Sequence, residues 1–227
     1  MIEDQFTTPG REPTRSLADL SVPRRPENIP YKGGEDYDAQ ALLVANGYTV
    51  TAPSLIELLD SDLGILQAAA ARVLGAQNER AAINALQRLM QNATAEETSR
   101  VQAAFALARM DVADAKEMLI RLLEFPPEAS PAPLQAAGAL ANLGDPRGFE
   151  VVRAALDSPN RVIAMIACKQ LFNFAALDSS HVDVFEAFSR ALTRPEPNIS
   201  GEARAQLEEL NTEKARATLA AYPPQNR

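Results

Sequence analysis

The stretch LQAAGALANLGDPRGFEVVRAALDSP, residues 134–159, decides the fold of this 227-residue chain. Its first half is rich in alanine, and Leu140 follows Ala136 and Ala137 by four and three positions. On a helix that spacing places the three side chains on one face. Turn-forming residues at 144–146 come next, and the run VVRAAL (151–156) then carries apolar residues at helical spacing. The stretch therefore predicts two short amphipathic helices joined by a tight turn.

The same pattern recurs along the chain from about residue 37. Equivalent leucines lie 33, 33, 31 and 36 residues apart, the fifth in a degenerate copy, at Leu74, Leu107, Leu140, Leu171 and Leu207. A second apolar element recurs in phase, in the segments 55–59, 86–90, 119–123, 151–156 and 188–192. One amphipathic helix pair cannot bury its apolar face alone, so neighbouring pairs must stack. We therefore predict an all-α fold, an α-solenoid of about five helix pairs, whose second helices carry the alanines.

The beginning of the chain differs from the rest in composition. Of 41 alanines, 40 lie after residue 38, whereas 5 of the 16 prolines lie within the first 35 residues. X-Pro steps favour extended backbone. We predict a proline-rich N-terminal arm over residues 1–35, the solenoid over 36–222 and a polar C-terminal tail over 223–227. The arm is interpreted either as a disordered leader or as an extended segment that docks on its own solenoid or on a partner.

Composition also excludes several classes of function. The net charge of −8 disfavours nucleic acid as a ligand. A single cysteine and a single histidine exclude a disulfide framework, a four-cysteine zinc site and a multi-histidine metal site. No glycine-rich phosphate loop, nucleophile elbow or Cys-His pairing is present. We expect no catalytic residue, no metal site and no cofactor.

The distribution of apolar residues bears on where the protein is located. No apolar run approaches the roughly 18 residues of a membrane helix. The first ten residues hold no apolar signal-peptide core. We therefore expect a cytoplasmic protein without membrane insertion.

The solvent side of the second helices is the candidate binding surface, because in solenoids that face lines a concave groove. We located the residues of this surface by their offset from the core leucines. Most of them are neutral or basic, although the chain as a whole is acidic. Arginine beside an aromatic ring is typical of interface anchors. Phe105 is expected to form an apolar notch opposite Gly138. The candidate groove residues are Arg72, Gln102, Phe105, Arg109, Gln135, Asn142, Lys169 and Asn173.

Three further features have a structural interpretation. Cys168 occupies an alanine position, so we predict a buried and inert thiol rather than a reactive one. His181 lies at the head of a first helix and is interpreted as a surface or capping residue. An arginine recurs at one position of the first helices, as Arg88, Arg121, Arg153 and Arg190. We expect this row on the outer face, either solvated or paired with acids of the adjacent repeat.

The stretches 134–159 and LQAAAARVLGAQNERAAINALQRLM (66–90) resemble HEAT-like repeats, of the short type found in phycobilisome lyases and bacterial scaffold proteins. The resemblance covers about residues 37–210 and rests on packing residues, so it implies an architecture more than an activity. HEAT-like hydroxylases bind iron through repeated His-Glu pairs, which one histidine cannot supply. HEAT-like DNA glycosylases need a basic, aromatic concave face, which the acidic composition opposes.

These observations favour a non-enzymatic scaffold or adaptor that binds another protein through its concave face, its arm or both. The alternative comes from the resemblance: a chaperone-like bilin lyase holds an open-chain tetrapyrrole and its apoprotein. Under that alternative, Arg72, Arg109 and Lys169 are the residues that would meet the propionates. A third interpretation is a structural subunit of a large assembly.

Overall fold

The structure is a computed structural model that describes residues 16–24, 34–175 and 183–223. Within these ranges every regular element is helical, and none is a strand. The first helices of five pairs are α2 (Ala52–Leu58), α4 (Ile83–Gln91), α6 (Ala115–Leu122), α8 (Phe149–Ala155) and α10 (Val184–Leu192). The second helices are α3 (Gly64–Ala76), α5 (Glu97–Arg109), α7 (Ala132–Asn142), α9 (Arg161–Ala175) and α11 (Pro197–Leu210). The predicted all-α repeat fold is confirmed.

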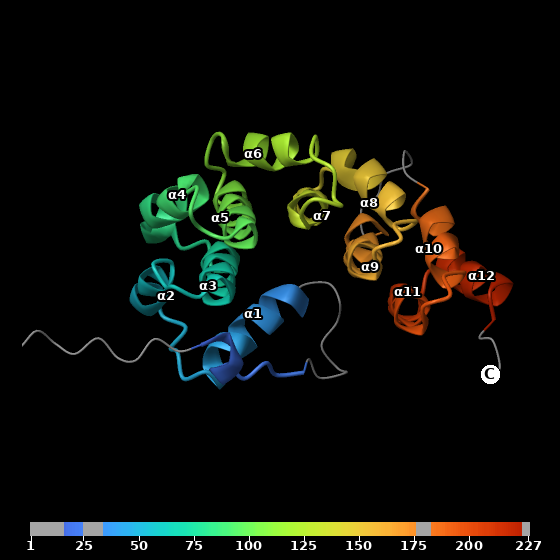
Figure 1. The fold of residues 1–227 in the computed structure, drawn as a ribbon, viewed down its shortest axis with the longest axis horizontal. Helices are drawn as coiled ribbons and strands as arrows, with labels where there is room; N and C mark the ends of the chain where they lie inside the picture. Colours follow the sequence, from blue (N-terminus) through green and yellow to red (C-terminus); the bar gives the residue numbers. More distant parts are fainter. Residues whose placement is uncertain (1–15, 25–33, 176–182, 224–227) are drawn as a thin grey trace, which may run out of the picture.

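The pairs form a curved row in which the first helices lie on the outer side and the second helices on the inner side (Figure 1). One further helix precedes the five pairs, α1 (Gly34–Ala45), and another follows them, α12 (Glu213–Ala221). Single 3₁₀ turns stand before α1, α4 and α8: η1 (Leu17–Asp19), η2 (Arg80–Ala82) and η3 (Pro146–Gly148). The inner side of the curve is therefore built from α3, α5, α7, α9 and α11, with α1 beside α3 (Figure 1).

The repeated leucines form the core, as their spacing predicts. Leu74, Leu107, Leu140, Leu171 and Leu207 are all fully buried. The alanines before them are buried too, and their small side chains let adjacent second helices approach closely. Buried side chains of α7 belong both to the core of the N-terminal repeats and to that of the C-terminal repeats. The central helix therefore joins the two halves of the core.

Local sequence explains where the helices begin and end. Proline lies in the first turn of α2, α7 and α11, where its missing N–H costs no hydrogen bond. Asp183 and Thr212 cap α10 and α12 by accepting hydrogen bonds from backbone N–H groups at 3.1 and 3.2 Å. After α7, Gly144 takes a φ of 79°, in the left-handed region that glycine adopts without strain.

Polar contacts between pairs fix how the repeats stack. The Ser99 hydroxyl donates to the carbonyl of Gly64 in the preceding pair at 2.9 Å. Asp145, in the turn after α7, accepts from the Arg147 guanidinium and lies 2.9 Å from the Lys116 ammonium of α6. These cations hold the pKa of the Asp145 carboxyl well below its usual range, Arg147 having the larger effect. The turn thereby ties α6 to the pair that follows.

Gly75 is expected to be intolerant of a side chain, because α3 and α5 approach closely there. A Cβ at Gly75 would lie 2.7 Å from the Ala106 Cα of α5. Gly75→Ala should therefore lower the free energy of unfolding by about 1–3 kcal/mol, the usual cost of overpacking. Gly201→Ala is the matched control, since nothing lies within 4 Å of its added Cβ in α11. That change should stabilise by about 0.5–1 kcal/mol through helix propensity. Urea unfolding measures both, and equal stability of the Gly75 variant and the parent would contradict the close approach.

Two parts of the predicted arm are described: residues 34–35 begin α1, and residues 16–24 dock on the solenoid. The backbone N–H of Ser21 donates to Asn46 Oδ1 at 2.8 Å, and Asn46 Nδ2 donates back to the Ser21 carbonyl at 2.8 Å. Leu20 packs against the core of the N-terminal repeats. Residues 1–15 and 25–33 of the predicted arm lie outside the described residues, as do residues 224–227 of the predicted tail.

Candidate functional site

The inner side of the first two pairs holds two arginines stacked on one aromatic ring. The guanidinium carbons of Arg72, on α3, and Arg109, on α5, lie 5.2 and 5.4 Å from the centroid of the Phe105 ring. Both distances are within the range of a cation–π interaction. Arg72 Nη1 also donates to Gln102 Oε1 at 3.2 Å. We call Arg72, Phe105 and Arg109 the arginine stack.

Two carboxylates from the first turn of α1 meet the arginine stack. Arg72 Nη2 lies 2.5 Å from Glu35 Oε2, and Arg109 Nη1 lies 2.9 Å from Asp36 Oδ2. The other oxygen of Asp36 lies 2.8 Å from Arg72 Nε, an ion pair without the alignment of a hydrogen bond. Asp36 therefore bridges both arginines, and the Arg72 side chain keeps only 12% of its surface exposed.

The position of α1 departs from the regular stacking of second helices. Ser99 precedes its core leucine, Leu107, by eight residues and contacts Gly64, near the start of the neighbouring second helix. Glu35 precedes the buried Leu43 by the same eight residues but contacts Arg72, near the end of α3. The first turn of α1 is thus placed over the C-terminal halves of α3 and α5, on the inner side of the curve.

Phe105 is not a solvent-facing groove residue, so that expectation is wrong. Phe105 is 2% exposed and belongs to the core of the N-terminal repeats, with the guanidinium groups of Arg72 and Arg109 over its ring. The expected apolar notch opposite Gly138 is also wrong. A Cβ at Gly138 would lie 1.7 Å from Gln170 Oε1, so a carboxamide fills that space.

The remaining candidate groove residues lie in three settings. Gln102 is half-buried under Arg72, and Gln135 is half-buried and donates to Thr98 Oγ1 at 3.2 Å. Asn173 is half-buried against Gln170 on its own helix. Asn142 and Lys169 are exposed. The predicted groove is thus closed over α3 and α5 and exposed at these two positions on α7 and α9.

Glu35 and Asp36 are not among the residues predicted for the groove from the sequence. Asp36 and Arg109 are 73 residues apart in the chain, and no periodicity connects the two. The only signal available was the adjacent pair of acids at the head of the first alanine-containing helix. Such a pair is ordinarily explained by the helix dipole alone.

Cys168 is buried, as predicted, and its Sγ donates to the carbonyl of Ile199 at 3.6 Å. Burial raises the pKa of the Cys168 thiol to about 12, Glu202 adds to the rise and Lys169 opposes it. His181, interpreted as a surface or capping residue, lies outside the described residues.

Cys168 should resist thiol reagents in the native state, because a thiol with so high a pKa supplies little thiolate at neutral pH and is enclosed as well. Mixing with 5,5′-dithiobis(2-nitrobenzoate) should give no stoichiometric release of colour until denaturant is added. Rapid full labelling of the folded chain would contradict the buried position and favour the reactive thiol.

The arginines of the first helices are either exposed to solvent or paired with acidic side chains. Arg88 and Arg121 are exposed. Arg153 pairs with Glu150 on its own helix, and Arg190 lies 3.2 Å from Asp157 of the preceding pair. Both predicted settings therefore occur, and Arg88 and Arg121 offer outer-face control positions.

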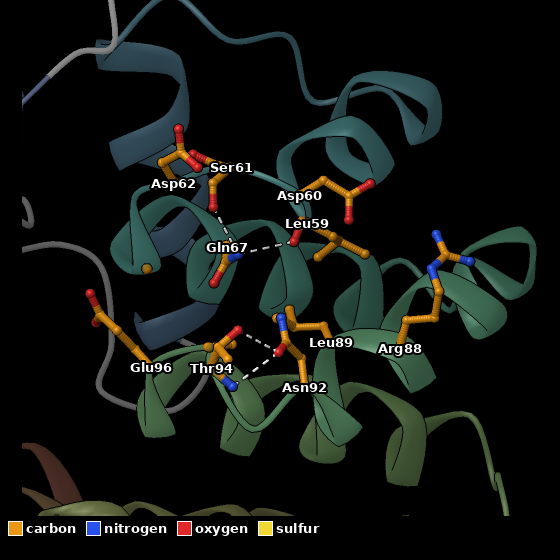
Figure 2. A pocket seen from close by; sticks show the side chains of 12 residues that line it. Leu59, Asp60, Ser61, Asp62, Gln67, Arg88, Leu89, Asn92, Thr94 and Glu96 are labelled. Atoms are coloured by element: carbon orange, nitrogen blue, oxygen red, sulfur yellow. Dashed lines mark hydrogen bonds between the residues drawn. The ribbon is translucent and has the colours of Figure 1, made fainter.

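A pocket of about 520 Å³ lies at the turns of the first two pairs (Figure 2). Its polar groups brace the turns: Gln67 Nε2 donates to the Ser61 carbonyl at 2.8 Å, and Asn92 Oδ1 accepts from Thr94. Three acids line it, Asp60, Asp62 and Glu96. Across the described parts of the chain, no group of three or more His, Cys, Asp or Glu side chains is placed to hold a metal ion. The described helices also include none with the length and apolar character needed to cross a bilayer.

Comparison with known proteins supports the repeat assignment. Residues 133–158 match the family model of the PBS lyase HEAT-like repeat. The search of curated proteins found no match. Among solved structures, the crystal structure of an engineered protein from the Northeast Structural Genomics Consortium is 19% identical, with a TM-score of 0.45, over 74% of this chain and 83% of that one. Residues 133–158 thus match a HEAT-like repeat, and the helix pairs on both sides of them are consistent with the same repeat architecture.

Proposed function

We propose that this chain is a scaffold that binds another protein through the inner face of its second helices. One observation carries the proposal: that face already holds a helix end, since the first turn of α1 is bound across α3 and α5 by the arginine stack. Beyond α5, Asn142 and Lys169 expose polar atoms on the same series of second helices. A solenoid that presents such a face supplies an extended concave surface for a partner.

Site-specific photocrosslinking tests this proposal in living cells. A benzoylphenylalanine is placed at position 142 or 169 on the inner face, and at position 88 or 121 on the outer face as a matched control. All four side chains are exposed in the structure, so the replacement disturbs no core contact. We expect positions 142 and 169 to capture the same partner protein, and positions 88 and 121 to capture none of it. Capture only from the outer positions, or from none, would refute binding through the inner face.

The bilin lyase alternative has one observation in its favour. The arginine stack holds two carboxylates, and the two propionates of an open-chain tetrapyrrole offer the same chemistry. For a bilin to bind, Glu35 and Asp36 would have to leave Arg72 and Arg109. Co-expression with a bilin and a phycobiliprotein apoprotein distinguishes the alternatives: a lyase gives a coloured adduct, and a protein-binding scaffold gives none.

A further inference from the structure

The arginine stack is organised by contacts that do not involve α1. The buried Phe105 ring lies within cation–π distance of both guanidinium groups, and Gln102 accepts a hydrogen bond from Arg72. Guanidinium donors are arranged in a planar fork that matches carboxylates. If the first turn of α1 left, two adjacent cations would therefore remain fixed in place, in a chain whose net charge is −8.

The first turn of α1 is held mainly by charge. The buried residues of α1, Ala39, Leu42 and Leu43, all lie in its middle and second half. In the first turn, Glu35 and Asp36 keep 40% and 26% of their side chains exposed, and Tyr37 is exposed. Helix ends open locally at little cost where few apolar contacts hold them. The first turn can thus separate from the stack while Leu42 and Leu43 stay in the core.

We propose that the arginine stack is a binding site for two adjacent carboxylates in the first turn of a partner protein's helix, and that Glu35 and Asp36 of α1 occupy it in competition with that partner. The inference rests on the proposed function and names the partner's recognition element: an acidic helix N-terminus. Charge complementarity supports this occupant, because Asp36 shows that one carboxylate spans both arginines while Glu35 engages one of them.

A binding assay with a defined probe tests the competition. The probe is a fluorescent peptide of residues 34–45, GEDYDAQALLVA, with blocked ends, and its matched control carries Gln and Asn in place of the two first acids. The proteins are the full chain, its E35Q/D36N variant and an E57Q control, which changes an exposed acid on the outer helix α2. Fluorescence anisotropy gives the affinities.

The E35Q/D36N variant should bind the acidic peptide at least tenfold more tightly than the parent or the E57Q control. The neutral peptide should not show this gain. Adding Arg109→Gln to the variant should remove most of the gain, and raising the salt concentration should weaken binding, because the contacts are ionic. In the parent, saturating acidic peptide should speed amide hydrogen exchange at residues 38–40, whose N–H groups bond to the carbonyls of the first turn, and leave exchange at Leu42 and Leu43 unchanged.

Equal binding of the acidic peptide to the parent and the E35Q/D36N variant would overturn the inference. So would equal binding of the acidic and the neutral peptide, a comparison that needs no change to the protein and therefore no assumption about folding. The two proposals fail separately. Crosslinking from positions 142 and 169 without peptide binding would support the scaffold proposal and refute the acidic-helix site. Peptide binding without crosslinking from these positions would support the acidic-helix site and refute the scaffold proposal.

Discussion

Phe105→Ala is expected to lower the free energy of unfolding by about 3–5 kcal/mol, the range for removing a buried aromatic side chain. The ring is 2% exposed and supports both arginines of the stack. Its loss leaves a cavity and also removes two cation–π contacts from partly buried cations. Arg72 and Arg109 would then hold Glu35 and Asp36 less firmly, so the first turn of α1 should open more often.

Equilibrium unfolding in urea, followed by circular dichroism, measures this cost. Phe125→Ala is the control, because Phe125 lies in the loop after α6 and is 60% exposed. The control should change stability by less than about 0.5 kcal/mol, as surface substitutions usually do. A Phe105 variant as stable as the Phe125 variant would mean that the ring faces solvent, as the repeat pattern alone suggested.

Leu140→Ala is expected to cost about 2–5 kcal/mol, the range for truncating a buried leucine to alanine. Leu140 is fully buried, and its helix, α7, contributes to the core on both sides. Because each repeat contacts only its neighbours, damage at the centre should spread in both directions. Hydrogen exchange should therefore become faster in α5 and in α9, as well as in α7.

Leu17→Ala provides the comparison, since Leu17 lies in the docked segment 16–24 with 65% of its side chain exposed. That change should leave the unfolding midpoint nearly unchanged. A Leu140 variant that melts within a degree or two of the parent would show that the repeat register is wrong.

The repeat could be predicted because its information is local. Leu74, Leu107 and Leu140 recur at a nearly constant interval, and each lies three and four residues after small side chains. That spacing selects a helix and one buried face of it. The turns after the first helices, at residues such as Pro126 and Pro195, divide the chain into pairs in the same local way. The buried position of Cys168 followed from the same register.

The candidate site could not be predicted in this way, because its contacts are not periodic. Phe105 and Lys169 lie at the same position in their repeats, two residues before the core leucine. Lys169 is exposed, yet Phe105 is buried. The two arginines over the Phe105 ring, Arg72 and Arg109, pair with acids of a single non-repeating helix, α1. A repeat pattern describes how each pair meets its neighbour, whereas the first turn of α1 is held by charges brought together across the chain.

The amino-acid sequence by itself determined that this protein is a stack of paired helices, that the repeated leucines form its core and where the turns lie. Those properties depend on burial of apolar side chains at helical spacing, which a chain shows residue by residue. Only the tertiary structure decided that the first turn of α1 lies over Arg72 and Arg109, whereas Asn142 and Lys169 are exposed. That division depends on ion pairs between residues 37 and 73 positions apart, and charge attraction of this kind leaves no periodic trace in a sequence.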